Sequence, residues 1–361
     1  MIAPLLLAAW LGTQDGVTKI PLLPPGPDNP RNSEGDFIPL RDGRLLFVYT
    51  RFTGESGSDH APAHLASRVS SDGGRTWSER DEVVVPREGD MNVMSVSLLR
   101  LSKSGDIALV YLRKDSLQKC VALMRRSADD GRTWSEPVPC MPGQEGYFVV
   151  NNDRLVQLSS GRLVLPASRR SGDDQKPAPG RARCFLSDDE GRTWRSGTTE
   201  LPAPEKSRSG LQEPLVVELG DGRLLMLCRT DRGRQYRSFS ADGGDTWSAA
   251  EPSELVSPLS PASLERIPST GDLLLVWNDH AGIDDARRGK RTPLCTAVSK
   301  DDGRTWTSVK VLEQDPEGWY CYTAIEFVGR RVLLAYCAGD PKVGRLNRTQ
   351  ITSFDVDWLY R

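Results

Sequence analysis

An eight-residue pattern, S-x-D-x-G-x-T-W, occurs five times in this chain, and successive copies end 53 to 60 residues apart. Ser and Asp side chains bond backbone N–H groups a few residues ahead and favour tight turns. The fixed Gly suits a backbone φ above zero, while the Trp offers a large apolar surface to the sheet beneath. Each copy, or octet, therefore predicts a structural hairpin turn, not a catalytic element. The octets are Ser70–Trp77, Ser127–Trp134, Ser187–Trp194, Ser240–Trp247 and Ser299–Trp306.

A second repeat runs out of phase with the octets. Six glycines each open a largely apolar run, such as DGRLLFVYT or DGRLLMLCR, which is typical of a hairpin entering a buried strand. The two repeats together give six units of about 57 residues with four strands each, and no segment has a useful helical period. Such units predict an all-β fold, a six-bladed β-propeller of four-stranded antiparallel blades with five octet turns. The glycines are Gly43, Gly105, Gly161, Gly222, Gly271 and Gly329.

The two ends of the chain carry separate signals. The last unit lacks an octet and ends in QITSFDVDWLY, and we expect the N-terminal stretch GVTKIPLLP to pair with it and close the ring. Residues 15–361 are expected to form one domain, because no linker-like stretch separates the units. Residues 1–14 resemble the apolar part of a secretory signal, with a buried N-terminal strand as the alternative. A secreted or periplasmic location is therefore expected, and a cytoplasmic one stays open.

Composition excludes several classes of protein. Apolar residues make up 38% of the chain, charged residues 27%, and the formal charge is −2, which is typical of a globular protein that does not bind nucleic acid. No apolar run approaches the roughly 20 residues that span a bilayer, so no membrane span is expected. The seven cysteines form no C-x-x-C pair, and we expect several to be buried free thiols. Neither a metal nor a cofactor is expected.

Five octets on this period are similar to the Asp boxes of the sialidase (neuraminidase) superfamily, whose members are six-bladed propellers. The similarity covers nearly the whole chain. It implies an exo-α-sialidase, a glycoside hydrolase that removes terminal sialic acid from a glycan or glycoprotein with retention of configuration. It also implies an Asp acid/base, a Tyr nucleophile paired with a Glu, and three arginines on the substrate carboxylate. Non-enzymatic propellers carry Asp boxes too, so function depends on the site residues.

Five residues match the motifs of that superfamily. Asp59 lies eleven residues before the first octet, where the family has its acid/base. Glu213 and Arg229 flank one Gly turn in LQEPLVVELGDGRLLMLCRT, a block that resembles the family's Glu and Arg closely. Arg291 lies eight residues before the fifth octet, and Tyr322 begins Y-T-A-I, which resembles the family's nucleophile motif. The resemblance implies that these residues, from four different blades, meet in one pocket.

These residue types suit a substrate with a carboxylate on its anomeric carbon. A phenol nucleophile is neutral, whereas an Asp or Glu nucleophile would meet like charge. The ordinary pKa of a phenol is about 10, so Glu213 would take the proton of Tyr322 as the bond forms. Asp59 would protonate the leaving oxygen and then activate water. Arginine binds both oxygens of a carboxylate through its planar fork.

Further polar residues are candidate substrate contacts. Tyr320 lies two residues before Tyr322, so both side chains should point to the same face of a strand, and Tyr320 could form a wall of the pocket. Asn152 and Asp153 interrupt the strand-like run YFVVNNDRL and could line the central pocket of a propeller. Turn capping is the alternative for this pair, and core packing is the alternative for either tyrosine.

One element of the family pattern is missing. The first of the three arginines belongs to an R-I-P motif, but here the matching stretch reads SEGDFIPL, with Phe37 or Asp36 at the position of the arginine. The nearest substitute is Arg31, whereas the R-I-P at Arg266–Pro268 is interpreted as a coincidental turn. This departure keeps two alternatives open: a propeller glycoside hydrolase for another acidic sugar, and a non-catalytic propeller that serves as a binding scaffold.

Overall fold

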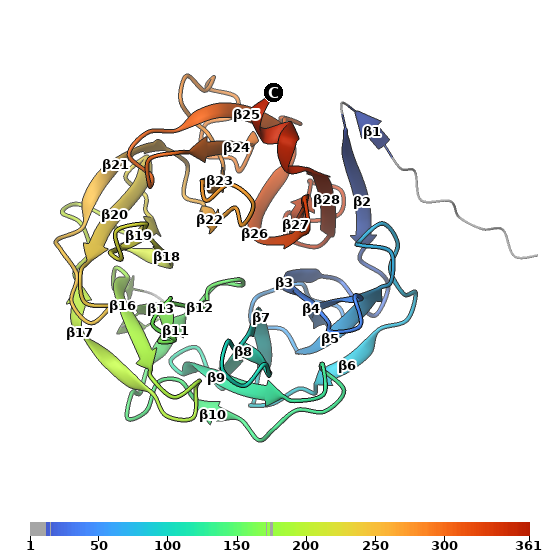
Figure 1. Cartoon of the computed structure of the whole chain (residues 1–361), viewed down its shortest axis with the longest axis horizontal. Coiled ribbons are helices and arrows are strands. Elements are labelled where there is room, and N and C mark those ends of the chain that lie inside the picture. The colour runs from blue at the N-terminus through green and yellow to red at the C-terminus, as the bar shows by residue number, and fades with distance from the viewer. Residues whose placement is uncertain (1–11, 15, 171, 174–175) are drawn as a thin grey trace, which may run out of the picture.

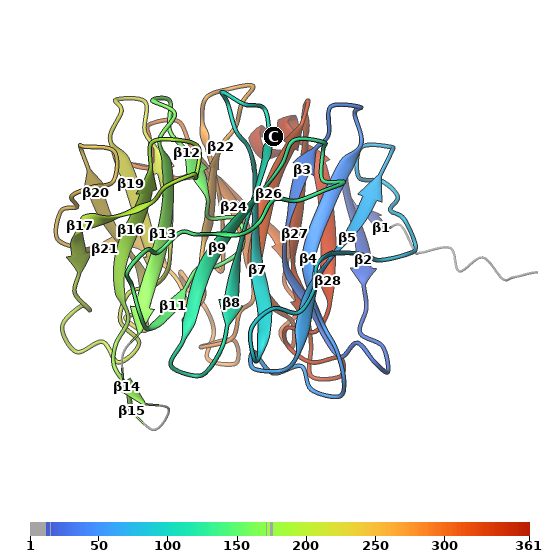
Figure 2. The ribbon, with the colours of Figure 1, turned by 90° about the horizontal axis from the view of Figure 1, so that it is seen from below.

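A computed structural model describes residues 12–14, 16–170, 172–173 and 176–361 of the chain. Its strands form sheets that follow one another around a common centre (Figure 1), and in side view most strands run along the axis of this ring (Figure 2). The only helical element among the described residues is the 3₁₀ helix η1 (Val356–Tyr360). The prediction of an all-β fold is confirmed.

Three sheets consist of four antiparallel strands in chain order. The first contains β3 (Asn32–Pro39), β4 (Leu45–Phe52), β5 (Ala63–Ser70) and β6 (Glu82–Val85). The second contains β18 (Gln212–Glu218), β19 (Leu224–Arg229), β20 (Arg234–Ser240) and β21 (Glu251–Val256). The third contains β22 (Ser263–Arg266), β23 (Leu273–Trp277), β24 (Leu294–Ser299) and β25 (Thr307–Glu313).

A nine-stranded sheet combines two meanders. One contains β7 (Asn92–Arg100), β8 (Ile107–Lys114), β9 (Cys120–Ser127) and β10 (Val138–Pro139). The other contains β12 (Val156–Gln157), β13 (Leu163–Arg170), β16 (Arg181–Ser187) and β17 (Arg195–Leu201). They are joined by β11 (Tyr147–Val149), which is antiparallel to β13 and makes a single parallel bridge to β9. The hairpin of β14 (Gly172–Asp173) and β15 (Lys176–Pro177) projects from one face (Figure 2).

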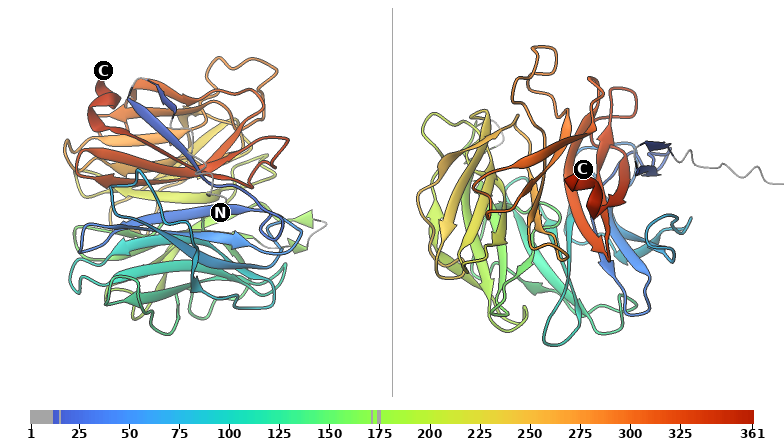
Figure 3. Two further views of the ribbon diagram at one scale, coloured as in Figure 1. Left: turned by 90° about the vertical axis from the view of Figure 1, so that its right-hand side faces the viewer. Right: turned by 45° about the horizontal axis from the view of Figure 1, so that its top comes forward.

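The fifth large sheet joins the two ends of the chain. Its C-terminal strands are β26 (Trp319–Val328), β27 (Arg331–Gly339) and β28 (Thr349–Asp355), and β28 also pairs with β2 (Val17–Leu23) (Figure 3). The pairing expected for the N-terminal stretch is therefore confirmed. β2 in turn pairs with β1 (Gly12–Gln14), while the rest of the signal-like segment, residues 1–11, lies outside the described residues. Export stays a prediction.

The hydrophobic core is divided between the sheets. Among the described residues, buried apolar side chains form six clusters, each between strand groups that follow one another around the ring. Val48 of β4, for example, shares a cluster with Leu109 of β8, and Leu225 of β19 shares one with Leu275 of β23. Full burial of such a side chain contributes about 1.5–3 kcal/mol, so the sheets stabilise one another face to face.

The octets form the predicted turns. In the third octet, Ser187 Oγ donates to Asp189 Oδ1 at 2.8 Å and accepts from the N–H of Gly191 at 2.8 Å. Thr193 donates to Asp189 through its N–H at 2.8 Å and its hydroxyl at 2.6 Å. Gly191 has a φ of 81°, and Trp194 is buried against the core. The octet therefore closes on itself, as a structural turn should.

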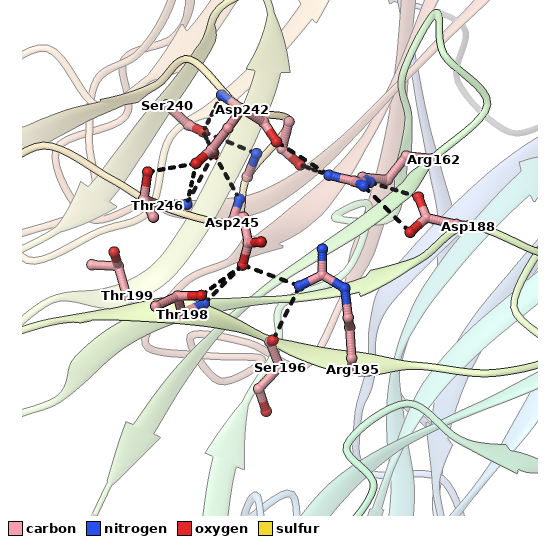
Figure 4. A network of polar contacts seen from close by, with 12 residues as sticks. Arg162, Asp188, Arg195, Ser196, Thr198, Thr199, Ser240, Asp242, Asp245 and Thr246 are labelled. Carbon is pink, nitrogen blue, oxygen red and sulfur yellow. Dashed lines mark hydrogen bonds and ion pairs between the residues drawn. The ribbon is translucent and has the colours of Figure 1, made fainter.

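The octets also connect neighbouring units (Figure 4). Arg162 donates to Asp188 of the third octet at 2.7 and 3.3 Å and to the carbonyl oxygens of Asp242 and Gly243 in the fourth. Since strands alternate in direction, every octet lies at the face opposite the β4–β5, β23–β24 and β27–β28 loops. One face of the ring is thus committed to structural turns, and the other is free for a site.

A short segment, Asn151–Arg154, crosses between β11 and β12 and binds strands from several sheets. Asn152 Nδ2 donates to the carbonyl oxygens of Gly35 in β3 and Tyr322 in β26, at 2.9 and 3.1 Å. The N–H of Asp153 donates to the carbonyl oxygen of Val96 in β7 at 3.0 Å. Arg154 reaches the carbonyl oxygen of Ala262, next to β22, at 2.9 Å. This central segment ties the inner strands of four sheets together.

Carboxyl groups surround the central segment. Burial raises the pKa of Asp36 and Glu265, and it raises the pKa of Asp153 to about 6 and of Glu326 to about 8. Asp153 adds to the shift of the other three through its negative charge. Arg154 is the cation among them, and burial lowers its pKa. One cation cannot neutralise four buried carboxylates, so ionising all four acids at once would cost free energy.

Replacement of Glu326 tests this acid cluster. A folded-state pKa of about 8 means that folding takes up a proton, so the contribution of Glu326 to stability is full near pH 4 and is lost as the pH rises through 8. Glu326→Gln should leave the free energy of unfolding unchanged at pH 4 and raise it by about 1–2 kcal/mol at pH 8.5, measured by urea unfolding. Glu82→Gln, at an exposed position, should show no such difference. An equal effect of Glu326→Gln at both pH values would contradict the assignment.

A glycine contact tests the packing that supports β18. A Cβ atom on Gly210 would lie 2.2 Å from the backbone N and O atoms of Gly180, and Gly210 has a φ of 75°. We expect Gly210→Ala to lower the free energy of unfolding by about 3 kcal/mol, from backbone strain plus overlap. Gly222→Ala is the matched control, because Gly222 has a φ of 83° and no atom within 4 Å of its Cβ position. The control should lose only about 1–2 kcal/mol, and equal losses in urea unfolding would contradict the overlap.

Candidate functional site

Four inner strands carry a β-bulge at a residue whose φ is positive although it is not glycine. These residues are Glu34 in β3 (53°), Ser95 in β7 (61°), Glu213 in β18 (45°) and Tyr322 in β26 (60°). Such a conformation costs about 1–3 kcal/mol, and a bulge re-aims the side chain it carries. All four side chains line the same cavity. The bulges therefore turn one side chain from each of four strands towards a common point.

The cavity has a volume of about 220 Å³ and is lined mainly by polar side chains. Its walls come from the bulged strands, from the β4–β5 loop and from the strands around β11. Besides the four bulge residues, the polar and aromatic lining consists of Asp59, Lys114, Tyr147, Phe148, Asn151, Ser168, Arg170, Gln212 and Arg229. A polar cavity of this size at the centre of a ring is suited to a small, charged ligand.

Tyr322, Glu213 and Arg229 form the core of the site. Tyr322 Oη donates to Glu213 Oε1 at 3.4 Å, and Arg229 Nη1 donates to both Glu213 oxygens, at 2.8 and 2.7 Å. Burial alone would raise the pKa of Glu213, but the charges of Arg229 and Arg291 outweigh it and lower that pKa. Burial and the charge of Glu213 raise the pKa of the Tyr322 phenol. The arrangement is a neutral phenol beside an ionised base.

Arg291 lies against the ring of Tyr322. Its guanidinium carbon lies 5.1 Å from the centre of the Tyr322 ring and 5.5 Å from the Trp319 ring, while Arg345 covers Trp319 at 4.4 Å. Arg291 is buried, and its Nε and Nη1 atoms have no hydrogen-bond partner among the described residues. Aromatic faces therefore flank this cation, the charge of Glu213 acts on it, and two of its donor atoms have no partner among the described residues.

Arg31 lies at the start of β3 and is almost fully engaged. Its side chain is 1% exposed and donates to Ser33 Oγ at 2.9 Å, Gly57 O at 3.2 Å, Asp59 Oδ1 at 2.5 Å and Glu34 Oε1 at 3.1 Å. Arg31 is not among the described residues that line the cavity. Four of the five N–H groups of Arg31 are therefore engaged, and a ligand carboxylate would compete with these partners.

Asp59 lies at the cavity, on the loop between β4 and β5. Its side chain is 55% exposed, and its carbonyl oxygen accepts from Lys114 Nζ at 2.7 Å and Asn92 Nδ2 at 3.0 Å. Burial would raise the pKa of its carboxyl, but the charge and hydrogen bond of Arg31 prevail and lower it. Asp59 is therefore an anchored, ionised carboxylate.

The sequence did not identify Glu34 as a site residue. Its carboxylate accepts from Arg31 and from Ser95 Oγ, the latter at 3.2 Å. Burial raises its pKa to about 7, partly offset by Arg31, and the charges of Asp59 and Glu213 raise it further. Glu34 reaches the cavity only because of the bulge in β3, and no pattern in SEGDFIPL signals a bulge.

The structure brings Asp59, Glu213, Arg229 and Tyr322 to one cavity, with Arg291 against Tyr322. The expectation that Tyr320 and Tyr322 share a face is wrong, because the bulge between Cys321 and Ala324 breaks the alternation. The Tyr320 side chain instead packs in a core cluster, with its ring 6.3 Å from that of Tyr336.

The other candidates lie away from the cavity wall. Asn152 and Asp153 belong to the central segment and bond to strand backbones, so the structure does not bring them into the lining. Phe37, at the position of the missing arginine, is buried in the core. Arg266 donates to Asp302 Oδ1 and to the carbonyl oxygen of Glu218 at the octet face, in agreement with its interpretation as a structural turn.

The remaining expectations concern cysteines, metals and membranes. All seven cysteines are free and buried. Within the described part of the chain, no group of three or more His, Cys, Asp or Glu side chains could hold a metal ion. No helix in that part is long and apolar enough to cross a bilayer.

The model of the BNR repeat-like domain family matches residues 43–330 of the chain. A sialidase from Micromonospora viridifaciens is 28% identical over 324 residues, which cover 79% of this chain and 46% of the relative. A sialidase from Bacteroides fragilis is 24% identical over 330 residues, covering 82% and 58%. The chain thus spans about half the length of the curated relatives it matches.

A solved structure shows the same fold at low sequence identity. A point mutant of the NanB sialidase from Streptococcus pneumoniae superposes with a TM-score of 0.70 and 16% identity, over 93% of this chain and 70% of that one. At this identity the likeness concerns the fold and says nothing about the reaction.

Proposed function

The chain belongs to the BNR repeat-like domain family and to the sialidase superfamily, and from this premise we propose that it is an exo-α-sialidase. It would remove terminal sialic acid from a glycan or glycoprotein and retain the anomeric configuration. The observation that carries the proposal is the group of Tyr322, Glu213, Arg229 and Arg291, which couples a phenol, a base and two cations beside a polar cavity.

In the first step, Tyr322 Oη attacks the anomeric carbon of the sugar. The raised pKa of the phenol makes Tyr322 a weak nucleophile until Glu213, 3.4 Å away and ionised, accepts its proton. The neutral phenol avoids the repulsion that a carboxylate nucleophile would meet from the substrate carboxylate. Arg291, stacked on the phenol ring, stabilises negative charge as it develops on the oxygen.

The substrate carboxylate would bind Arg229 and Arg291. Arg229 Nε, like the Nε and Nη1 atoms of Arg291, is buried and has no hydrogen-bond partner among the described residues. A buried, unpaired donor is costly, so a ligand anion that pairs with these atoms gains affinity. Arg31 is not proposed as a third carboxylate-binding arginine, because its donors already bind Asp59, Glu34 and Gly57.

Asp59 would act as the acid/base. It is the most exposed carboxylate at the cavity, as a group should be that meets both the leaving oxygen and the incoming water. Its proton would go to the glycosidic oxygen while the bond to the anomeric carbon breaks. In the second step Asp59 would take a proton from water, and Glu213 would return its proton to Tyr322.

We also propose that the ring has six blades. In this interpretation the nine-stranded sheet is two blades, one of β7–β10 and one of β12, β13, β16 and β17, joined by β11. The six apolar clusters support this division, because each would fill the interface between two successive blades.

A second candidate is a hydrolase for a different acidic sugar. The engagement of Arg31 and the presence of Glu34 in the cavity favour it, because both reduce the positive charge available to a carboxylate. A non-catalytic scaffold is less well supported. Buried ion pairs such as Glu213–Arg229 rarely add net stability, so a binding surface alone would not explain them.

The test is hydrolysis of the 4-methylumbelliferyl conjugate of sialic acid. We expect wild-type turnover and a loss of about 10³-fold or more in Tyr322→Phe, which keeps the ring and removes the nucleophile. Tyr320→Phe is the matched control, because Tyr320 packs in a core cluster two residues away, and it should keep activity within about threefold. NMR of the first-formed product should show retained configuration.

Three outcomes separate the candidates. Turnover of only another uronic or ulosonic conjugate by the wild type would favour the second candidate. An inactive wild type that binds such sugars would favour the scaffold. An active Tyr322→Phe would overturn the tyrosine mechanism, whatever the sugar.

A further inference from the structure

Two carboxylates of the site share one guanidinium. Arg31 Nη1 binds Asp59 Oδ1 at 2.5 Å, and Arg31 Nη2 binds Glu34 Oε1 at 3.1 Å. Asp59 and Glu34 both line the cavity, whereas Arg31 lies behind them. Within this trio one positive charge serves two carboxyl groups, so the trio carries a net negative charge when both acids are ionised. Lys114 (β8) and His60 (β4–β5 loop) also lower the pKa of Asp59 through their charge.

The surroundings of Glu34 decide which acid keeps a proton. The Glu34 side chain is 5% exposed, whereas that of Asp59 is 55% exposed, so ionisation costs more at Glu34. Among the described residues, Arg31 is the one cation that forms an ion pair with Glu34, and Arg31 is already shared with Asp59. The titratable or charged groups that act on Glu34 from the elements around it are Arg31, Asp59 (β4–β5 loop), Tyr147 (β11), Glu213 (β18) and Cys337 (β27).

The backbone at Glu34 is arranged to expose this group to the cavity. Glu34 has a φ of 53°, which a glutamate rarely adopts. A Cβ atom on the next residue, Gly35, would lie 2.7 Å from the carbonyl oxygen of Val48, so only glycine fits the second position of the bulge. The central segment holds the bulge through Asn152, which binds Gly35 O. Strain kept by this much supporting structure indicates a function for Glu34 beyond packing.

From this geometry we propose that Glu34 and Asp59 form one acid pair, bridged by Arg31, that enters the reaction with a single proton stored on Glu34. The inference rests on the proposed glycosidase function. In the free protein Asp59 is ionised and cannot donate. When substrate fills the cavity, the proton moves from Glu34 to Asp59 through a water, and then to the leaving oxygen.

The proton balance of this scheme is closed. The glycosidic bond breaks, the leaving oxygen gains the pair's proton, and Glu34 and Asp59 are both ionised around Arg31. Tyr322 binds the sugar and its own proton lies on Glu213. In the second step water attacks the anomeric carbon and returns one proton to the pair, the bond between Tyr322 Oη and that carbon breaks, and the phenolate regains its proton from Glu213. Glu34 touches no reacting atom, so it is a positioning residue that sets the proton supply of Asp59.

Glu34→Gln separates this role from a structural one. The variant keeps the shape and removes the proton store, leaving Asp59, whose pKa Arg31 lowers. With sialyllactose, whose leaving group needs acid assistance, wild-type kcat/KM should fall above about pH 7, and in Glu34→Gln the fall should begin at least one pH unit lower. At pH 7 the variant should lose at least about tenfold on sialyllactose but less than about threefold on the 4-methylumbelliferyl conjugate, whose leaving group needs little assistance.

Three further variants serve as controls. Ser95→Ala removes the hydrogen bond to Glu34 Oε2 but keeps the acid, and Glu34→Asp keeps a carboxyl. In both variants, kcat/KM on sialyllactose should therefore fall only above about pH 7, as in the wild type. Asp59→Asn should fail on sialyllactose at every pH, whereas Glu34→Gln should recover only as the pH falls below 3.8, the ordinary pKa of an aspartate, because Arg31 lowers the pKa of Asp59. If Glu34→Gln does not fold, the test is the pH at which kcat/KM on sialyllactose falls in Glu34→Asp and Ser95→Ala.

If kcat/KM on sialyllactose falls at the same pH in Glu34→Gln as in the wild type, the acid pair is overturned. Equal losses of activity on both substrates would also overturn it, and so would an early fall of kcat/KM in both Glu34→Asp and Ser95→Ala. None of these outcomes touches the proposed function, which fails only when the wild type hydrolyses no sialoside.

Discussion

The site depends on one backbone constraint: inner strands must leave the regular pleat just where they reach the centre of the ring. A regular strand would send alternate side chains into the spaces between sheets, where apolar groups belong. The bulges at Glu34, Ser95, Glu213 and Tyr322 instead turn polar groups towards the axis. Hydrogen bonds from the central segment hold three of these bulges, through Gly35, Val96 and Tyr322.

Charge is distributed unevenly over this scaffold. Three guanidinium groups, those of Arg229, Arg291 and Arg154, lower the pKa of Glu213. Glu34 and Asp59 share the guanidinium of Arg31, and Arg154 is also the cation beside the acids of the central segment. A packed interior screens charge weakly, so the number of cations near each buried carboxyl group raises or lowers the pKa of that group. Within one ring, charge and burial therefore lower the pKa of one glutamate, Glu213, and raise the pKa of another, Glu34.

The repeats in the sequence were enough to predict the octet turns, the all-β fold and the pairing of the two chain ends. They were enough because an octet such as Ser187–Trp194 contains all the partners of its own hydrogen bonds. Bulges are different, since the contacts that stabilise them come from distant strands. The alternation rule therefore assigned Tyr320 and Tyr322 to one face, and Glu34 was overlooked. Family resemblance located Asp59, Glu213, Arg229, Arg291 and Tyr322 because it transfers residues without having to derive their geometry.

The antiparallel seam between β2 and β28 has a kinetic consequence. It matches Thr18 with Ser353, so the ring closes through a loop of more than 300 residues. Closing so long a loop costs about 5 kcal/mol of chain entropy, and only the finished seam recovers it. Assembly of the ring should therefore be slow at its final step and hard to reverse once made, since topologies with distant partners fold late. The cavity at the centre of the ring should therefore become rigid only when β2 has paired with β28.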